Sequence, residues 1–191
     1  MNMKIILASQ SPRRLEILNN HGIKPIVIPA DIDETLPDDI TCEDAVKMLA
    51  KKKAAAVYEQ IKNDPKYDDA VIIGSDTIVY KDKIMGKPLD ENDAYSMLSS
   101  IRNTKHYVAT GVAIIEVHTG KETILCDLTT VYCKDYSDEE IWAYIESATP
   151  FDKAGSYAIQ GEFSKYIDHI DGDYENVVGL PFYRIETLIK K

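Results

Sequence analysis

The sequence predicts an α/β fold with a mixed sheet, because strand-like and helix-like segments alternate and are then followed by a β-hairpin. Residues 4–8 form a short apolar strand, and Ser11 followed by proline marks the start of a helix. Farther along, the apolar segments 107–117 and 122–133 flank a Thr-Gly turn, which predicts the hairpin. Strands joined through helices run parallel and hairpin strands run antiparallel, so one sheet should contain both kinds of pairing.

The remaining elements follow from apolar periodicity and from residues that start helices. Thr41 with Asp44, and Ser137 with Glu140, have the spacing of helix-capping pairs. The predicted strands span residues 4–8, 24–28, 70–80, 107–117 and 122–133. The predicted helices span residues 12–19, 41–62, 90–101 and 137–147, and a short helix follows Pro181. Residues 151–180 are rich in glycine and are expected to form strand and loop; no linker divides residues 1–191, so they should form a single domain.

Composition restricts the class of protein and the kind of partner. With 45% hydrophobic and 28% charged residues, the chain has the balance of a globular protein rather than of a disordered one. Its net charge of −10 argues against a nucleic acid polymer as partner, but a few basic residues in a cleft can still hold a triphosphate, especially with a divalent metal. The sequence lacks a membrane-spanning apolar run and a signal peptide, so we expect a cytoplasmic protein with three free cysteines.

Two arginines at the start of the first helix form the first candidate site. Arg13 and Arg14 oppose the helix dipole, whose positive end and free N–H groups favour an anion. Two arginines in a row therefore indicate a bound phosphate, although two solvated surface arginines would give the same pattern.

Lys53 is the second candidate. On the helix that begins near Thr41, the apolar positions recur at helical spacing, and Lys53 lies within this stripe, four residues after Leu49. An inward-facing lysine requires an anionic partner, whereas a lysine at the edge of the stripe could extend its ammonium to water.

Asp76 is the third candidate, because it interrupts the apolar strand 70–80. A carboxylate in such surroundings needs a metal, a cation or hydrogen-bond donors, and it is suited to act as a general base or a metal ligand. The alternative is a structural aspartate bonded to loop amides. Shortly afterwards a Gly-Lys-Pro turn presents Lys87.

Two further segments carry polar groups that could bind a ligand. The acidic cluster at residues 31–35 could hold a divalent cation, and it also resembles the D-x-D-x-T motif of haloacid-dehalogenase-like phosphatases, with Asp31 as nucleophile. Asp31, however, follows Pro-Ala rather than the end of a strand. In the glycine-rich segment 152–161, Gln160 offers a donor and an acceptor for the edge of a base. The four histidines form no motif.

Taken together, these segments resemble the Maf family, also called septum formation inhibitor-like proteins. The matching motifs occur in order at residues 9–18 (SQSPRRLEIL), 32–34 (IDE), 49–54 (LAKKKA), 76–79 (DTIV), 86–88 (GKP), 106–112 (HYVATGV), 152–161 (DKAGSYAIQG) and 172–181 (GDYENVVGLP). They extend over almost the whole chain.

This resemblance implies an elongated α/β molecule with two lobes around a cleft, similar to inosine triphosphate pyrophosphatases. It implies water attack on the α-phosphorus of a nucleoside triphosphate, with pyrophosphate leaving and Mg²⁺ or Mn²⁺ assisting. Asp76 would accept the proton of the water and share the metal with Glu34, and Lys53 would complete the catalytic set. The triphosphate would be bound by Ser11, Arg13, Arg14, Lys53 and Lys87.

Within the family, the subgroup acting on dTTP and UTP is similar to this chain in having threonine after the catalytic aspartate, here Thr77, together with Arg13 and Gln160. The subgroup acting on 7-methyl-GTP usually has glutamine in place of this threonine. The chain departs from the family pattern at Arg102-Asn103 and Ala148-Thr149. The resemblance is compatible with a homodimer, and its alternative function is a nucleotide-binding regulator of cell division with little turnover.

Overall fold

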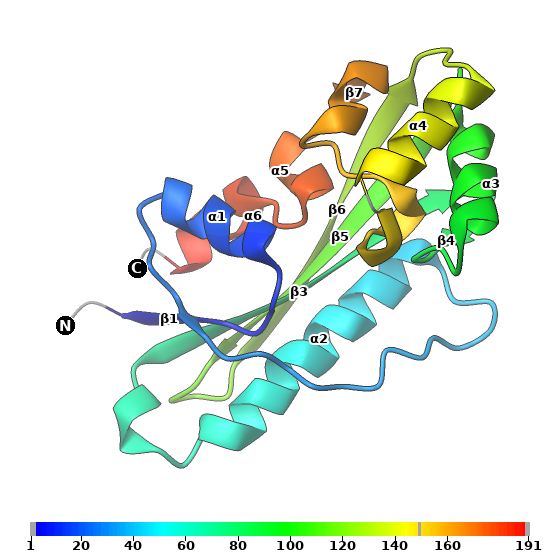
Figure 1. The fold of residues 1–191 in the computed structure, drawn as a ribbon. Coiled ribbons are helices and arrows are strands. Elements are labelled where there is room, and N and C mark those ends of the chain that lie inside the picture. Colours follow the sequence, from blue (N-terminus) through cyan, green and yellow to red (C-terminus); the bar gives the residue numbers. More distant parts are fainter. Residues whose placement is uncertain (1–2, 149, 190–191) are drawn as a thin grey trace. The chain divides into compact units, whose positions relative to one another are not determined.

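The computed structural model describes residues 3–148 and 150–189, in which helices cover a mixed seven-stranded sheet (Figure 1). The strands are β1 (Lys4–Leu7), β2 (Ile26–Val27), β3 (Ala70–Lys81), β4 (Lys83–Met85), β5 (Lys105–Glu116), β6 (Glu122–Cys133) and β7 (Ile167–Asp171). The α-helices are α1 (Pro12–Asn20), α2 (Cys42–Ile61), α3 (Glu91–Ile101), α4 (Asp138–Ala148), α5 (Tyr174–Val178) and α6 (Phe182–Ile189). Short 3₁₀ turns are η1 (Pro65–Tyr67), η2 (Pro150–Asp152), η3 (Ala154–Ser156) and η4 (Glu162–Tyr166).

The strand order is β2-β1-β3-β5-β6-β7, with β4 beside β3. Strand β1 pairs parallel with both β2 and β3, while β4 pairs antiparallel with β3 and β7 antiparallel with β6. This combination confirms the predicted α/β class with a mixed sheet. The cleft between two lobes that the family resemblance implies stays a prediction.

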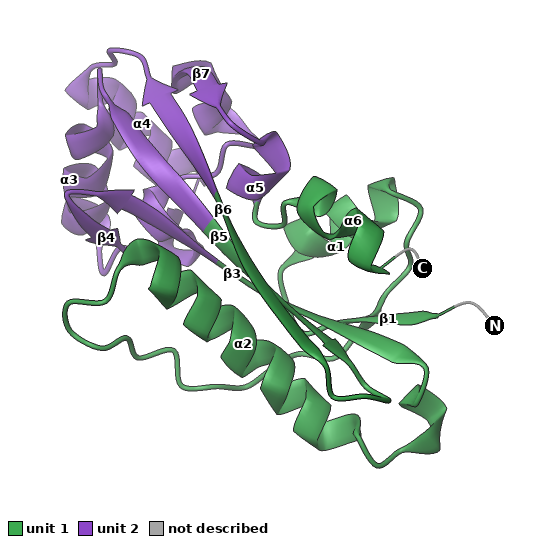
Figure 2. Cartoon of the chain, turned by 180° about the vertical axis from the view of Figure 1, so that it is seen from behind, with its two compact units in different colours: residues 1–76, 110–127, 179–191 green, residues 77–109, 128–178 purple. Residues whose placement is uncertain are grey.

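The chain divides into two compact units (Figure 2). The first contains Met1–Asp76, Thr110–Asp127 and Gly179–Lys191, and the second contains Thr77–Ala109 and Leu128–Val178. The boundary falls inside β3, β5 and β6, so these three strands each contribute residues to both units.

In the first unit, α2 covers one face of the sheet and α1 and α6 cover the other (Figures 1 and 2). Helix α2 packs directly on strand backbone at two glycines. A Cβ atom on Gly74 would lie 2.4 Å from the carbonyl oxygen of Ala50, and one on Gly111 would lie 2.3 Å from that of Val46. Only glycine permits so close an approach, and it brings the apolar stripe of α2 into the core.

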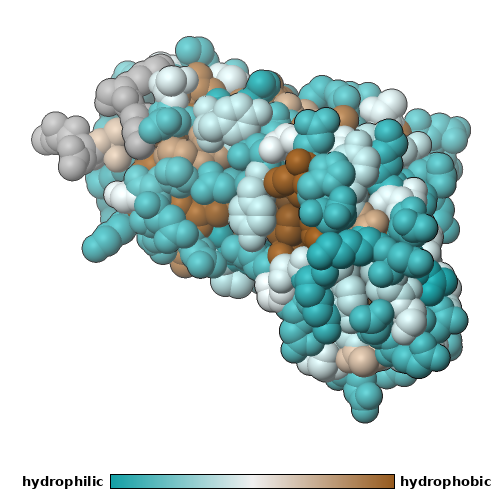
Figure 3. Space-filling view, turned by 90° about the horizontal axis from the view of Figure 1, so that it is seen from above, coloured by the Kyte–Doolittle hydropathy of each residue, from teal (hydrophilic) through white to brown (hydrophobic). Residues whose placement is uncertain are grey.

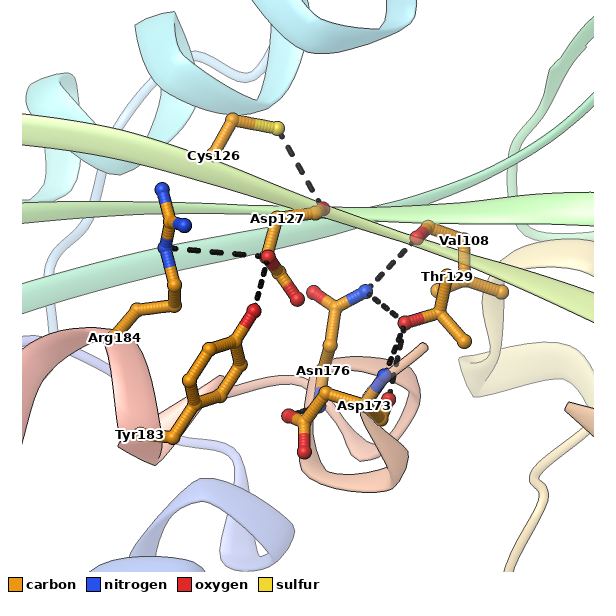
Figure 4. A network of polar contacts seen from close by, with 8 residues as sticks. All are labelled: Val108, Cys126, Asp127, Thr129, Asp173, Asn176, Tyr183 and Arg184. Carbon is orange, nitrogen blue, oxygen red and sulfur yellow. Dashed lines mark hydrogen bonds and ion pairs between the residues drawn. The ribbon is translucent and has the colours of Figure 1, made fainter. Parts of the chain in front are cut away.

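In the second unit, α3, α4 and the 3₁₀ turns surround a cluster of aromatic side chains centred on the buried Phe163. Helix α4 begins with the predicted capping pair, since Ser137 and Glu140 each accept a hydrogen bond from the other's backbone N–H. A buried polar network ties the loop before α5 to the sheet: Thr129 Oγ1 donates to the carbonyl of Asp173, and Asn176 Nδ2 donates to Thr129 and to the carbonyl of Val108 (Figure 4).

Most predicted elements are confirmed, with differences where local chemistry intervenes. The strand predicted at residues 24–28 contains only Ile26 and Val27. Pro25, which has no N–H group to donate to β1, precedes its start, and the N–H of Ile28 after its end still donates to the Leu7 carbonyl at 3.1 Å. The glycine-rich segment contains β7 as expected, but it also forms three 3₁₀ turns and α5. At one departure from the family pattern, Arg102 bonds to Asp138 at 2.7 Å. At the other, Thr149 lies outside the described residues.

The surface is mostly hydrophilic, as Figure 3 shows for one face. Two of the exposed large apolar side chains lie on β6, and the others are distributed along the chain: Val27, Leu89, Ile124, Leu128, Trp142, Phe151, Tyr174 and Tyr183. None of the helices in residues 3–148 and 150–189 combines the length and hydrophobicity needed to cross a lipid bilayer.

Candidate active site

A lysine held between two carboxylates forms the centre of the site in the first unit. Lys53 Nζ lies 2.6 Å from Asp76 Oδ1 and 2.7 Å from Glu34 Oε1. The side chains of Lys53 and Asp76 are each only 12% exposed, whereas that of Glu34 is 53% exposed. Lys53 is therefore an inward-facing lysine with anionic partners, as one of the two sequence interpretations required.

The backbone explains why Lys53 and Asp76 meet. Gly74 faces α2, where it contacts Ala50 and Ala54, so α2 lies against this side of β3. Side chains two residues apart on a strand point to the same face, so Asp76 also points toward α2. Lys53 precedes Ala54 on that helix and reaches the carboxylate.

Arg14 is fixed on α1 by two oxygen acceptors. Its Nε donates to the carbonyl of Gly179 at 2.8 Å, and its Nη1 donates to Ser9 Oγ at 3.1 Å. Burial lowers the pKa of Arg14, the negative charge of Asp76 raises it, the neighbouring Arg13 lowers it and Glu34 raises it. Arg14 therefore lies in the same electrostatic cluster as the two carboxylates and is not a solvated surface arginine.

The N-terminus of α1 has the predicted form. Ser11 takes the N-cap position, Pro12 occupies the first turn, and the backbone N–H of Ser11 donates to Ser9 Oγ at 3.2 Å. The Ser9 hydroxyl therefore connects the loop before the helix to Arg14.

Two carboxylates that share one ammonium also suit a divalent cation. Among residues 3–148 and 150–189, no three His, Cys, Asp or Glu side chains gather as a metal cage. Mg²⁺, however, is usually held by one or two carboxylates, with phosphate oxygens and water completing its shell. Asp76 and Glu34 fit this pattern for a metal that is shared with a triphosphate.

The acidic cluster does not have the placement that the phosphatase interpretation needs. Asp31 is exposed in the irregular segment that follows the two-residue β2, rather than at the end of a buried strand. Asp33 Oδ1 accepts hydrogen bonds from the backbone N–H and the hydroxyl of Thr35, and these bonds lower the pKa of Asp33. Of this cluster, Glu34 is the residue that joins the charged centre.

Thr77, Lys87 and Gln160 belong to the second unit. Thr77 follows Asp76 on β3, and Lys87 is exposed in the turn after β4. The backbone N–H of Gly155 donates to the carbonyl of Gly86 at 3.0 Å. This bond joins the turn that carries Lys87 to the segment that carries Gln160.

Three groups support the charged centre without a role predicted from the sequence: Ser9, which lies in the motif at residues 9–18, Ser75 and Gly179. Ser75 is fully buried, and its hydroxyl donates to the Gly179 carbonyl at 2.9 Å, the same oxygen that accepts from Arg14. Ser75 is a polar interruption of the apolar strand, but the strand pattern does not indicate which group accepts its hydrogen bond. The acceptor at Gly179 is a main-chain oxygen, for which no residue type gives a signal.

Comparison with known proteins assigns the chain to a family. A family profile described as Maf-like protein matches residues 4–191, so the chain belongs to the Maf family, as its motifs indicated. It is 43% identical over 189 residues to a dTTP/UTP pyrophosphatase of Caldicellulosiruptor saccharolyticus, and the matched region covers 98% of this chain and 94% of that protein. It is similar, at 41% identity, to one of Alkaliphilus oremlandii, over 98% of this chain and 95% of that protein. A dTTP/UTP pyrophosphatase of Bdellovibrio bacteriovorus is 36% identical over the full length of both chains.

Proposed function

We infer that this chain is a nucleoside triphosphate pyrophosphatase that hydrolyses dTTP and UTP to the monophosphate and pyrophosphate. The observation that carries this inference is the placement of Lys53 between the carboxylates of Asp76 and Glu34, in one charge cluster with Arg14. Full-length similarity to three pyrophosphatases of this specificity supports the choice of substrate.

Asp76 acts as the general base. Its carboxylate takes a proton from water while the water oxygen bonds to the α-phosphorus, and the bond from that phosphorus to the α,β-bridging oxygen breaks. Cations close to the triphosphate stabilise its negative charge and the charge that develops on the departing pyrophosphate. Lys53, Arg13 and Arg14 supply them from the first unit.

A divalent cation, Mg²⁺ or Mn²⁺, belongs to this proposal, with Glu34 and Asp76 as its protein ligands. When bound, it neutralises phosphate charge and polarises the α-phosphoryl group. Ser11 and Lys87 add contacts to the triphosphate. Thr77, Arg13 and Gln160 select a pyrimidine base.

We also propose that residues 1–191 act as a single domain, as a cytoplasmic enzyme that can form a homodimer. The net charge of −10 disfavours a nucleic acid polymer as substrate, because binding its phosphate backbone needs a basic face.

The test is incubation of the purified protein with a panel of nucleoside triphosphates and Mg²⁺ or Mn²⁺, followed by identification of the products. Pyrophosphate and monophosphate from dTTP and UTP are expected. Release from 7-methyl-GTP instead would contradict the role of Thr77, and release of orthophosphate would point to Asp31 chemistry. Nucleotide binding without turnover would favour a regulator of cell division.

A further inference from the structure

His106 is a buried group that the proposed reaction does not use. It lies on β5, is 0% exposed, and its Nε2 lies 2.6 Å from Tyr157 Oη. The two rings meet edge-on with centroids 5.4 Å apart, and His106 Nδ1 lies 3.9 Å from Cys133 Sγ. All three residues belong to the second unit. The pair therefore connects β5 to the segment that carries Gln160.

Both partners of this hydrogen bond are neutral near pH 7. Burial lowers the pKa of His106 to about 4, with a further contribution from the positive charge of Lys81. Burial also raises the pKa of Tyr157 well above its usual value. A short bond between two buried neutral groups is costly to break, because the partner that remains cannot find water.

The segment that begins at Tyr157 is held at both ends. The ring of Tyr157 lies 4.7 Å from that of Phe163, which is 1% exposed, and Ile159 between them is also buried. Gln160 lies between these anchors and is half-exposed, and Gly161 after it has a φ of +93° that reverses the chain. The anchors thus limit where the Gln160 amide can lie.

The preceding residues are fixed as well. Gly155 has a φ of +67°, and a Cβ atom there would lie 2.9 Å from Val79 Cγ1, so the segment contacts β3 directly. Ser156 Oγ lies 3.1 Å from Met97 Sδ on α3. Among the attachments that precede Gln160, the His106–Tyr157 bond is the side-chain hydrogen bond nearest to it in sequence.

We propose that His106 and Tyr157 are a positioning pair for base recognition: their hydrogen bond holds the segment 157–161 so that Gln160 meets the edge of the pyrimidine. The proposal rests on the proposed function, in which Gln160 contacts the base. Neither His106 nor Tyr157 touches the substrate. Their effect is therefore on nucleotide binding and base selection rather than on the chemical step.

The experiment compares Tyr157→Phe with Tyr136→Phe. Tyr136 is an equally buried tyrosine whose hydroxyl donates to the carbonyl of Leu98 at 2.8 Å, and it packs against the same Phe163 from outside the Gln160 segment. We expect Tyr157→Phe to raise KM for dTTP and UTP about tenfold while kcat stays within about twofold, the loss that one buried hydrogen bond produces. Tyr136→Phe should lower stability similarly and leave KM unchanged. Equal KM values for the two variants would overturn the proposal.

A second comparison separates positioning from a general loss of structure. In a Gln160→Ala background, Tyr157→Phe should no longer raise KM, because the group that it positions is gone. An additive effect in that background would contradict the proposal.

Hydrogen exchange provides a readout that does not depend on activity. Amides of residues 158–161 should exchange at least about tenfold faster in Tyr157→Phe, while those of β5 and β6 stay protected. Unchanged amide exchange at residues 158–161 would overturn the positioning role, whether or not the wild type hydrolyses dTTP. Failure of the wild type to hydrolyse dTTP would by itself reject only the proposed function. Should Tyr157→Phe not fold, His106→Asn is measured in the same way, with the same outcomes deciding.

Discussion

Ser75 and Asp76 are consecutive residues of β3 whose side chains reach opposite faces of the sheet: Ser75 Oγ donates to the Gly179 carbonyl at 2.9 Å, and Asp76 Oδ1 accepts from Lys53 at 2.6 Å. The same Gly179 oxygen also accepts from Arg14 on α1. Two neighbouring residues of β3 are therefore connected to two cations: Ser75 to Arg14 through this shared oxygen, and Asp76 directly to Lys53 on α2. The arrangement of charge in the site therefore depends on the backbone of this strand.

Asp76→Asn should lower kcat/KM for dTTP by about 10²–10⁴-fold, because the amide cannot take a proton from water. Lys53→Ala should also cause a large loss, since it removes the cation between Asp76 and Glu34. Pyrophosphate release measures both. Lys51→Ala is the control on the same helix, where an exposed lysine pairs with Glu122, and it should leave kcat/KM within about twofold. Wild-type activity in Asp76→Asn would show that another group is the base.

Lys53→Met should bind Mn²⁺ more tightly than the wild type in the absence of nucleotide. The Lys53 ammonium lies between the two carboxylates that are proposed to hold the metal, so the cation and the lysine compete for the same oxygens. We expect at least about a tenfold gain in affinity, or 1.4 kcal/mol, measured by electron paramagnetic resonance of free Mn²⁺. Lys51→Met, with the same change of charge on α2, should bind Mn²⁺ as the wild type does. Equal affinities for all three proteins would mean that the metal has other ligands.

Gly74→Ala should destabilise the protein by about 1–3 kcal/mol, the usual effect of overpacking. The new Cβ atom would lie 2.4 Å from the carbonyl oxygen of Ala50 and 2.7 Å from the backbone nitrogen of Ala54, so α2 must move away from β3. Urea unfolding measures this loss. Gly86→Ala is the control, because its new Cβ atom would have no atom of the described chain within 4 Å apart from its chain neighbours. The free energy of unfolding of this variant should differ from that of the wild type by less than about 0.5 kcal/mol. A stable Gly74→Ala protein would indicate that α2 can shift freely.

Acid should weaken the fold through His106. Its pKa is about 4 in the folded protein, below the value near 6.5 of the unfolded chain, so the unfolded state binds more protons between these pH values. Stability from this group is complete above pH 6.5 and is lost as pH falls toward 4, by up to about 3 kcal/mol. The groups that face it are Tyr157, Cys133 and Lys81.

Urea unfolding at pH 7.0, 5.5 and 4.5 checks this dependence on His106. The quantity compared is the free energy of unfolding of the wild type minus that of His106→Asn. Taking this difference removes the contribution of other titrating groups. That difference should shrink as the solution becomes more acid. A difference that is constant with pH would show that His106 titrates normally in the folded protein.

The sequence predicted those residues of the charged centre that lie within apolar patterns, because such patterns indicate burial. For Lys53 within an apolar stripe and Asp76 within an apolar strand, a partner of opposite charge was one of the open interpretations, and the structure pairs the two residues. The role of Glu34 came from family motifs, because an exposed loop has no periodicity that reports which way its side chains point.

Other features depend on contacts that a local pattern cannot report. The brief β4 (Lys83–Met85) forms because it can pair with β3, and α5 (Tyr174–Val178) is held by contacts to Thr129 on β6. His106 was set aside because it forms no catalytic motif. Its partner Tyr157 is 51 residues away, a separation at which single-sequence reasoning has no means of pairing two side chains.

The bond from Arg14 to the Gly179 carbonyl joins residues 165 positions apart. A ribosome makes Arg14 well before Gly179, and the bond cannot form until the intervening sequence has been translated. Until then Arg14 has Ser9 Oγ as an acceptor but lacks the Gly179 carbonyl, and α6 has not been made. An emerging polypeptide that already contains Asp76 and Lys53 therefore lacks the main-chain oxygen that Arg14 Nε and Ser75 Oγ share, so this part of the first unit is completed only after translation has passed residue 179.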